Sequence, residues 1–441
     1  MRIVFILLIT LLSNPIWSQT QQFTLNNGLK ILVKEDHRAP IVVSMVWYNI
    51  GSADEPMGMT GISHVLEHLM FKGTKQYPLG VFSKKIAALG GQENAFTNND
   101  YTAYYEKIAA THLAISLELE ADRMSNLLLD SNEFDKEIKV IQEERRLRTE
   151  DNPQALTFER FLAAAHLSAP YQHPVIGWMN DLQHFSVEDA KRWYQQFYAP
   201  NNATLVVVGD VKADEVHRLA ETYFGKLAAR QQPLRKTPIE PPALGEKTIQ
   251  VHTPAQVPML ILGYTVPSVK SAPETEAKMP YALDVIATIL DSGDSGRLSK
   301  QLIHGSQVAS NANSYYNLYA RYQTQFVLFA TPSKTHTLDD VKKGILAEIN
   351  RLKTTRIDEQ ELRRIKTQIT AQKTFEKDSI FDQAMEIGLL ETVGLGWQAA
   401  GTYVDQINNV TAEDVQKAAN LYFQNNQMTQ ARLIPSKGNE S

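Results

Sequence analysis

The sequence predicts an α+β protein made of two homologous domains. Three observations lead to this fold class: the length of 441 residues, a proline-rich stretch near the middle, and a strand-and-helix pattern that starts again after that stretch. A chain of this length is long enough for two or three domains, each with its own core. Strand-like and helix-like segments are mixed in both parts of the chain.

The first predicted domain, residues 19–225, opens with strands. Residues 23–33 alternate apolar and polar side chains around Asn27-Gly28, which is a hairpin signal. Residues 41–48 are rich in β-branched and aromatic side chains and predict a second strand. Residues 95–108 contain strand-like aromatic runs around a turn at 98–100.

Helices are predicted in the same domain from apolar spacing and capping signals. Ser186 is placed to cap the last of them, and a buried strand at residues 203–208 follows. The predicted helices cover residues 61–71, 82–89, 113–129, 133–148 and 185–197.

Residues 226–248 are expected to be a linker between the two domains. Proline at this density continues neither a helix nor a central strand. The prolines are Pro233, Pro238, Pro241 and Pro242. The second domain is then residues 249–441.

The second domain repeats the pattern of the first. Ala39-Pro40 and the strand after it are matched by Val257-Pro258 and a strand at 259–264. Near the ends of the two domains, the cap Ser186 is matched by Thr411, each followed three residues later by aspartate. We infer two copies of one unit of about 200 residues. Coincidental similarity of strands and helices is the alternative.

The N-terminus indicates where the protein is located. Residues 1–18 are expected to be a signal peptide, because Arg2 precedes an apolar core that is too short to span a bilayer comfortably. An uncleaved membrane anchor is the alternative. No later segment predicts a membrane span, so we expect an exported protein, periplasmic in a bacterium.

Charge and cysteine content limit the chemistry. The net charge of −5 argues against nucleic acid as the main partner, since no basic excess is available to neutralise phosphates. The chain has no cysteine. Disulfides, thiolate nucleophiles and Cys-ligated zinc are therefore excluded, and any metal must be held by histidines and carboxylates.

The candidate site is the segment His64-Val65-Leu66-Glu67-His68. His64 and His68 are four residues apart, so one helical face carries both imidazoles, and Glu67 borders that face. Two imidazoles on a helix are a start for a zinc site, and a carboxylate beside the metal can take a proton from water. The order His-x-x-Glu-His is the inverse of the more familiar His-Glu-x-x-His. A core helix with two hydrogen-bonded histidines is the alternative.

The second copy keeps this helix without its polar residues. Residues 282–290 align with it, and Leu283 and Ala287 occupy the histidine positions. This difference indicates one active half and one supporting half.

The favoured third ligand is Glu144. Glu137 and Glu144 are seven residues apart on a predicted helix, so they share a face, and Val140 and Ile141 are expected to mark its buried side. Glu137 is placed to accept a hydrogen bond from a ligand histidine. A solvated, highly charged helix is the alternative. In the second copy Gln372 stands at the position of Glu144.

These residues resemble the M16 metallopeptidases, or inverzincins, which include pitrilysin and the mitochondrial processing peptidase. The resemblance covers nearly all of the mature chain and extends to Gly73-Thr74 and to residues 90–105. The size and two-copy layout resemble the short-chain bacterial and mitochondrial members. The resemblance implies the M16/LuxS-like fold, in which each domain is a mainly antiparallel sheet flanked by helices.

The resemblance also implies a zinc endopeptidase with one Zn²⁺ per chain. His64, His68 and Glu144 would bind the metal. Glu67 would be the general base that activates water. Glu137 would orient the site from behind a ligand histidine.

Substrate contacts are implied on both domains. Residues 92–97 would be an edge strand to which an extended peptide adds by main-chain pairing, through Asn94, Ala95 and Phe96. Family members often hold the substrate with an arginine and a tyrosine from the second half. Arg297 looks like that arginine, whereas the tyrosine position falls near Ala309.

The sequence therefore predicts an endopeptidase that cuts extended peptides or unfolded proteins. A homodimer, or a heterodimer with a related M16 chain, is expected as the assembly. The alternative function is a non-catalytic partner or scaffold subunit on the same fold.

Overall fold

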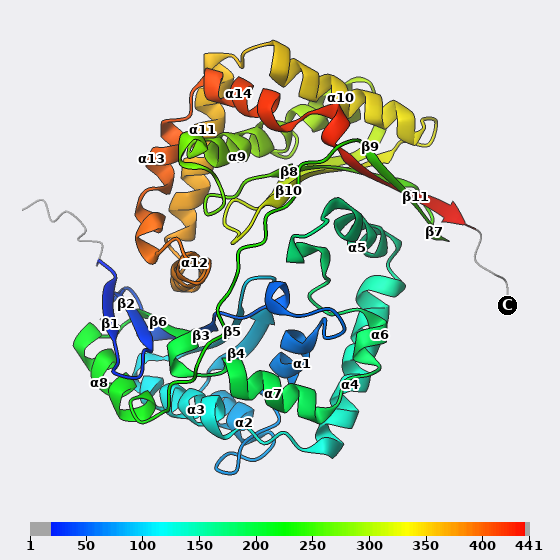
Figure 1. Ribbon diagram of the computed structural model, residues 1–441. Coiled ribbons are helices and arrows are strands. Elements are labelled where there is room, and N and C mark those ends of the chain that lie inside the picture. The colour runs from blue at the N-terminus through cyan, green and yellow to red at the C-terminus, as the bar shows by residue number, and fades with distance from the viewer. Residues whose placement is uncertain (1–18, 437–441) are drawn as a thin grey trace, which may run out of the picture.

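The computed structural model describes residues 19–436, so the predicted signal peptide lies outside the described residues. The chain forms two lobes, each built on one sheet (Figure 1). The first sheet consists of β1 (Gln21–Thr24), β2 (Lys30–Glu35), β3 (Ile41–Tyr48), β4 (Gln92–Thr97), β5 (Thr102–Ala109) and β6 (Ala203–Gly209). The second consists of β7 (Lys247–Pro254), β8 (Met259–Val266), β9 (Ala309–Tyr316), β10 (Thr324–Pro332) and β11 (Thr429–Ser436).

The two sheets have the same topology. The strand order β2-β6-β3-β5-β4 in the first corresponds to β7-β11-β8-β10-β9 in the second, and β1 extends the first sheet beside β2. In residues 19–436, the first pair of each series is parallel and the other paired strands are antiparallel. This correspondence confirms the predicted fold of two homologous domains with mainly antiparallel sheets.

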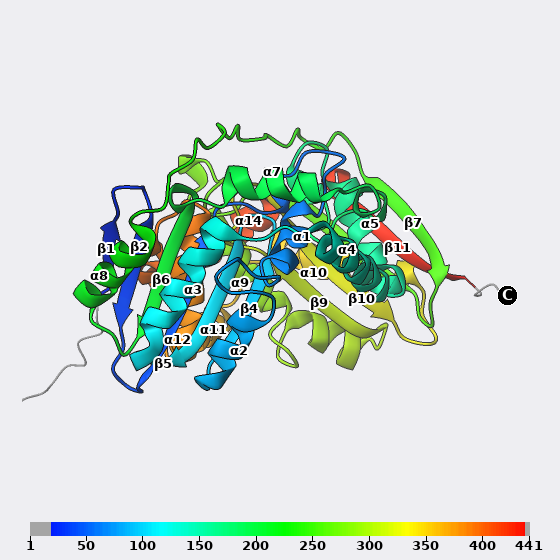
Figure 2. The same ribbon diagram turned by 90° about the horizontal axis from the view of Figure 1, so that it is seen from below.

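Helices flank the sheets in both lobes (Figure 2), and the predicted helices form with ends shifted by a few residues. The first half of the chain has α1 (Ile62–Leu69), α2 (Val81–Ala88), α3 (Leu113–Asn126), α4 (Ser131–Arg145), α5 (Pro153–Ala165), α6 (Met179–Leu182), α7 (Val187–Phe197) and α8 (Ala213–Phe224). The second half of the chain has α9 (Met279–Leu290), α10 (Leu338–Thr354), α11 (Glu359–Glu376), α12 (Ile380–Thr392), α13 (Tyr403–Asn408) and α14 (Ala412–Tyr422).

Capping explains where equivalent helices begin. The Ser186 hydroxyl accepts the backbone N–H of Asp189 at the start of α7, and the Asp189 carboxylate accepts the backbone N–H of Ser186. Thr411 and Asp414 form the same reciprocal pair at the start of α14. This capping box satisfies donors that a helix N-terminus would otherwise leave free.

The central strand β3 is buried on both faces because helices cover both sides of its sheet. Successive side chains of a strand point to opposite faces. Val42 and Val46 pack with the helices of their own lobe. Met45 and Trp47 point the other way, into a cluster with Ile387 of α12.

Each half of the chain supplies a helix to the sheet of the other half. Helix α12 lies on the first sheet, whereas α5 lies against the second sheet, where Phe161 packs with Ile261 and Leu433 (Figure 1). Neither helix is predicted from the sequence. The exchange buries apolar surface of both halves in shared cores, so the two lobes hold each other in place.

A buried ionic cluster joins the halves beside this exchange. The guanidinium of Arg321 lies 3.0 Å from the Asp54 carboxylate. The backbone N–H of Arg321 donates to the Asp100 carboxylate. Tyr171 also donates to Asp100, and Arg235 pairs with Asp54. Arg235 comes from the chain between α8 and β7, which carries no helix or strand and lies where the linker is expected.

Candidate metal centre

Helix α1 is anchored at its N-terminus by a buried carboxylate. Glu55 accepts the backbone N–H groups of Gly61 and Ser63 at 2.6 and 2.8 Å. Gly61 has φ of 93° and lies so close to Gly177 that a Cβ would meet the Gly177 Cα at 2.7 Å. Only glycine fits this left-handed, crowded position. The start of α1 is therefore fixed, and with it the direction of the side chains that follow.

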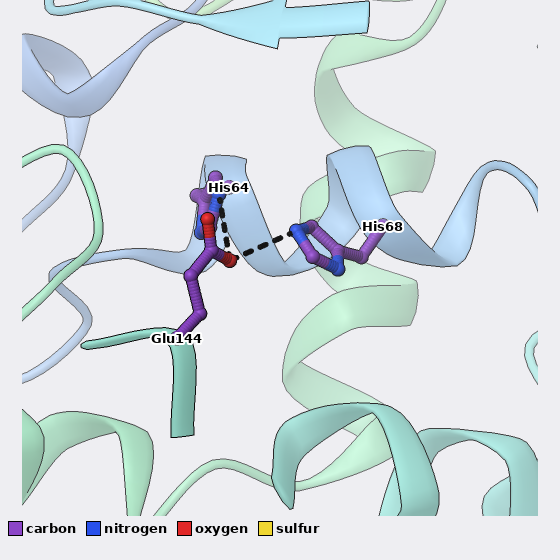
Figure 3. Close-up of side chains that lie close together, drawn as sticks. All are labelled: His64, His68 and Glu144. Atoms are coloured by element: carbon purple, nitrogen blue, oxygen red, sulfur yellow. Dashed lines mark ion pairs between the residues drawn. The ribbon is translucent and has the colours of Figure 1, made fainter. Parts of the chain in front are cut away.

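Three side chains, two from α1 and one from α4, come together in the space between these helices. His64 and His68 point from α1 toward Glu144, which lies at the end of α4 (Figure 3). Glu144 Oε2 is 3.7 Å from His64 Nε2 and 3.4 Å from His68 Nε2. One ligand atom from each residue lies within 4.8 Å of the others. In residues 19–436 no other group of three or more such side chains comes this close.

These residues fit a zinc ion. Glu144 Oε2 is buried and has no hydrogen-bond partner, and it faces both imidazole nitrogens. Burial and the neighbouring His68 lower the pKa of His64 to about 4. Two histidines and one carboxylate are a known catalytic zinc set, in which a fourth position stays open for water.

Glu137 lies behind His68, as the sequence predicts. Glu137 Oε1 is 2.9 Å from His68 Nδ1, and Lys72 pairs with the other oxygen of the same carboxylate. Burial opposes protonation of His68, but its contacts with Glu137 and Glu144 outweigh it and raise the pKa of His68 to about 9. A carboxylate in this place fixes the orientation of the imidazole and directs Nε2 toward the metal position.

Glu67 lies at the edge of the same site. It accepts a hydrogen bond from the Thr97 hydroxyl, at the end of strand β4. Burial raises the pKa of Glu67 and the Thr97 hydrogen bond partly offsets this. A carboxylate with a raised pKa and a fixed orientation is suited to general base chemistry near neutral pH.

The site opens into a cavity of about 1140 Å³. One wall is strand β4, the edge strand of the first sheet, which contributes Asn94, Ala95 and Phe96. The structure thus places the predicted substrate strand beside the metal residues. The larger apolar side chains that line the cavity outside β4 are Val140, Leu147, Phe158, Leu162 and Ile176.

Val140 corrects one sequence prediction. Ile141 is buried as expected, but Val140 is 52% exposed and lines the cavity. Val140 is four residues before Glu144, so it shares the helical face that carries the ligand rather than the face that packs on the core. The four-residue spacing of Val140 and Glu144 already shows that they share a helical face. Which face of α4 lines the cavity is known only once the position of α1 is known.

Arg297 is not brought to the cavity. It lies after α9, and its guanidinium makes two hydrogen bonds with the Glu361 carboxylate on α11, at 3.0 and 2.6 Å. Ala309, near the expected tyrosine position, is buried in β9. The structure therefore separates these residues from the metal residues, and Arg297 as a substrate contact stays a prediction.

Several residues around the site are absent from the sequence analysis. Lys72 and Thr97 hold Glu137 and Glu67 in place, and Phe158 of α5 forms part of the cavity wall. Lys72 directly follows the predicted His64 helix, and Thr97 is the last residue of the predicted substrate strand. Nothing in the local pattern indicated which carboxylate each would contact.

The described residues contain no helix that is both long and apolar enough to cross a membrane.

Comparisons with known proteins identify the family of the chain. The family described as "Insulinase (Peptidase family M16)" matches residues 30–177, and "Peptidase M16 inactive domain" matches residues 184–369. The first match contains His64, His68 and Glu144. The second begins before α7 and extends through most of the half that lacks them.

Two curated relatives match nearly end to end. "Zinc protease PqqE" of Helicobacter pylori is 33% identical, over 94% of this chain and 93% of its own length. "Mitochondrial-processing peptidase subunit beta" of Blastocladiella emersonii is 26% identical, over 92% of this chain and 86% of its own.

Solved structures share the fold. A protease from Helicobacter pylori superposes with a TM-score of 0.89 at 32% identity, covering 95% of this chain and 100% of that one. The first half of the periplasmic protease PqqL from Escherichia coli has a TM-score of 0.77 at 18% identity, covering 95% and 92%.

Proposed function

The chain belongs to peptidase family M16, and on that premise we propose that it is a zinc-dependent endopeptidase acting on extended or unfolded peptides. The observation that carries the proposal is the convergence of His64, His68 and Glu144 beside Glu67, in a cavity bordered by a free sheet edge. One Zn²⁺ per chain would be held by the first three residues.

Zinc in such a site polarises a peptide carbonyl and makes a bound water more acidic. Glu67 accepts the proton of the attacking water and can return it to the leaving nitrogen. Thr97 holds Glu67 in place through its hydroxyl. Glu137 and Lys72 keep the His68 ring fixed while this happens.

Strand β4 supplies the binding surface for the peptide. Its outer edge has no partner strand in the described sheet, so its main-chain groups can pair with an extended chain. Asn94, Ala95 and Phe96 lie along this edge in the cavity. Recognition through main-chain groups tolerates many side chains, so we propose a broad specificity for unfolded segments.

The proposed setting is an exported, periplasmic protein that works as a dimer. The apolar leader in the sequence supports export, and the structural neighbour PqqL is a periplasmic protease. The relative named as a processing peptidase subunit supports assembly with a related chain. A homodimer and a heterodimer are distinguished by the mass of the purified assembly.

The test is the substitution Glu67→Gln. We expect peptide cleavage to fall by about 10²–10⁴-fold, because general acid–base catalysis contributes that much, with one zinc per chain retained. Glu143→Gln is the matched control, since Glu143 lines the same cavity but is paired with Arg146. A zinc-loaded Glu67→Gln variant that cleaves peptide at the original rate would refute the assignment.

A non-catalytic subunit is the second candidate. The match of residues 184–369 to an M16 inactive domain favours it. That match lies outside the residues proposed to bind zinc, which is why the endopeptidase is preferred. A purified chain that binds no zinc and cleaves nothing, alone or with a related partner chain, would select the second candidate.

A further inference from the structure

Arg148 stands at the mouth of the metal cavity. It belongs to a π-helical turn, Arg146–Glu150, that continues α4 directly beyond Glu144. Its guanidinium Nη1 lies 2.8 Å from Glu144 Oε1, and its side chain lines the cavity. The proposed chemistry leaves this arginine without a role.

The two oxygens of Glu144 have different surroundings. Oε1 is paired with Arg148. Oε2 has no hydrogen-bond partner and lies between His64 Nε2 and His68 Nε2. We propose that Arg148 is a positioning residue that holds Oε1 of Glu144 and so keeps Oε2 directed at the zinc position. The inference rests on the proposed function, because it concerns the same zinc.

The neighbouring arginines do not share this geometry. Arg145 is buried and makes hydrogen bonds with Glu159 at 2.8 and 3.0 Å. Arg146 Nη1 lies 2.7 Å from Glu143. Each of the three arginines thus pairs with a different carboxylate, and of these three only Arg148 contacts one of the three clustered metal residues. The π-helical turn matters here, because such turns redirect side chains and are frequent at functional sites.

The second half provides an internal comparison. Helices α4 and α11 start at equivalent aspartates, Asp130 and Asp358. Counting from these caps, Gln372 stands at the position of Glu144 and Glu376 at the position of Arg148. Helix α11 also stays α-helical to Glu376, where the first half has its π turn. The second half therefore lacks, at the equivalent positions, the ligand carboxylate, the arginine that pairs with it and the π turn.

The expected effect is on metal affinity and not on fold stability. The Arg148 side chain is 74% exposed, and an exposed ion pair contributes little to folding. A group that orients a metal ligand typically changes metal affinity by about 10–100-fold when removed. An arginine also presents two donors to a carboxylate in fixed geometry, which lysine does not.

The experiment measures Zn²⁺ affinity of the full chain by competition with a chelator, together with the melting temperature of the zinc-free protein. We expect Arg148→Ala to bind Zn²⁺ about 10–100-fold more weakly and Arg148→Lys to be intermediate. Arg146→Ala is the matched control, since it removes a similar pair on the same turn that contacts no proposed ligand. All three variants should melt at the temperature of the original protein.

The outcomes separate this inference from the proposed function. If the original chain binds no Zn²⁺, the proposed function and the inference both fail. If it binds Zn²⁺ and Arg148→Ala binds it as tightly as Arg146→Ala, only the positioning role of Arg148 is overturned. Equal weakening by both alanine variants would also overturn it, because it would indicate a general effect of charge.

Discussion

The two halves of the molecule share a topology and differ in chemistry. Both have the same five-strand order and equivalent helix caps. The first half places His64 and His68 on α1, whereas the aligned residues of α9 are Leu283 and Ala287. Leu283 is fully buried. The second half shows that this fold forms without the polar residues, so in the first half they are available for chemistry.

The helix exchange shows a second difference. Helix α5 does two things: it covers the second sheet through Phe161 and lines the metal cavity through Phe158 and Leu162. Helix α12 covers the first sheet through Ile387 and is not part of the cavity. The second half therefore supports the site from a distance, by holding α5 and the first sheet in position.

The largest expected effect compares equivalent positions of α1 and α9. We expect His64→Ala to lose stoichiometric zinc while remaining folded, because it removes one of three donors. Leu283→Ala should keep zinc and lose about 2–5 kcal/mol of stability, because it opens a cavity in the core. Metal analysis and urea denaturation of both variants check this. Retention of stoichiometric zinc by His64→Ala would contradict the proposed difference in chemistry between α1 and α9.

The second prediction concerns the two arginines that connect the halves. Arg321→Ala removes a partner of Asp54, whose side chain is 7% exposed, and of buried Asp100, and should cost about 3–5 kcal/mol. Arg38 also joins the halves, through Asp378, but its side chain is 50% exposed. Arg38→Ala should cost at most about 1 kcal/mol. If Arg321→Ala and Arg38→Ala lose similar free energies of unfolding in denaturation experiments, burial does not determine how much these ion pairs contribute to stability.

The third prediction tests the exchanged helices at two glycines. A Cβ on Gly263 would meet Phe161 at 2.2 Å, and one on Gly388 would meet Trp47 at 2.0 Å. Alanine at either position should destabilise the protein by about 1–3 kcal/mol through overpacking. Gly401→Ala is the control, since nothing lies within 4 Å of its added Cβ. If Gly263→Ala and Gly388→Ala unfold like the control, the helices are less tightly packed than described.

The smallest expected effect concerns Arg297. Its pair with Glu361 is partly exposed and lies away from the cavity, so Arg297→Ala should change stability by at most about 1 kcal/mol. We expect KM for peptide cleavage to be unchanged. A clear rise in KM would support the sequence-based assignment of Arg297 as a substrate contact.

Much of the fold and of the candidate site could be predicted because the relevant signals are local. The β-branched and aromatic side chains of residues 41–48 predict β3 with the observed bounds. The spacing of His64, Glu67 and His68 and the spacing of Glu137 and Glu144 predict which side chains share a helical face. The repeat also predicts which half lacks the metal residues.

The parts that could not be predicted depend on contacts between distant segments. No local pattern reveals that α5 and α12 cover the sheet of the other half, because their apolar faces match distant segments of the chain. Val140 was placed on the wrong face because only the position of α1 defines the cavity side. Arg297 was assigned by resemblance, whereas its partner Glu361 is a long-range contact.

The sequence by itself determined the candidate donor set: two imidazoles on one helix and the Glu144 carboxylate on another, in one copy of a repeated unit. The tertiary structure decided how these groups meet. It brings Glu144 Oε2 within 3.7 Å of both histidines, pairs Thr97 with Glu67, and places Arg148 against the other oxygen of Glu144. The physical reason is that helical periodicity fixes directions within one helix, whereas distances between helices follow from how their apolar faces pack.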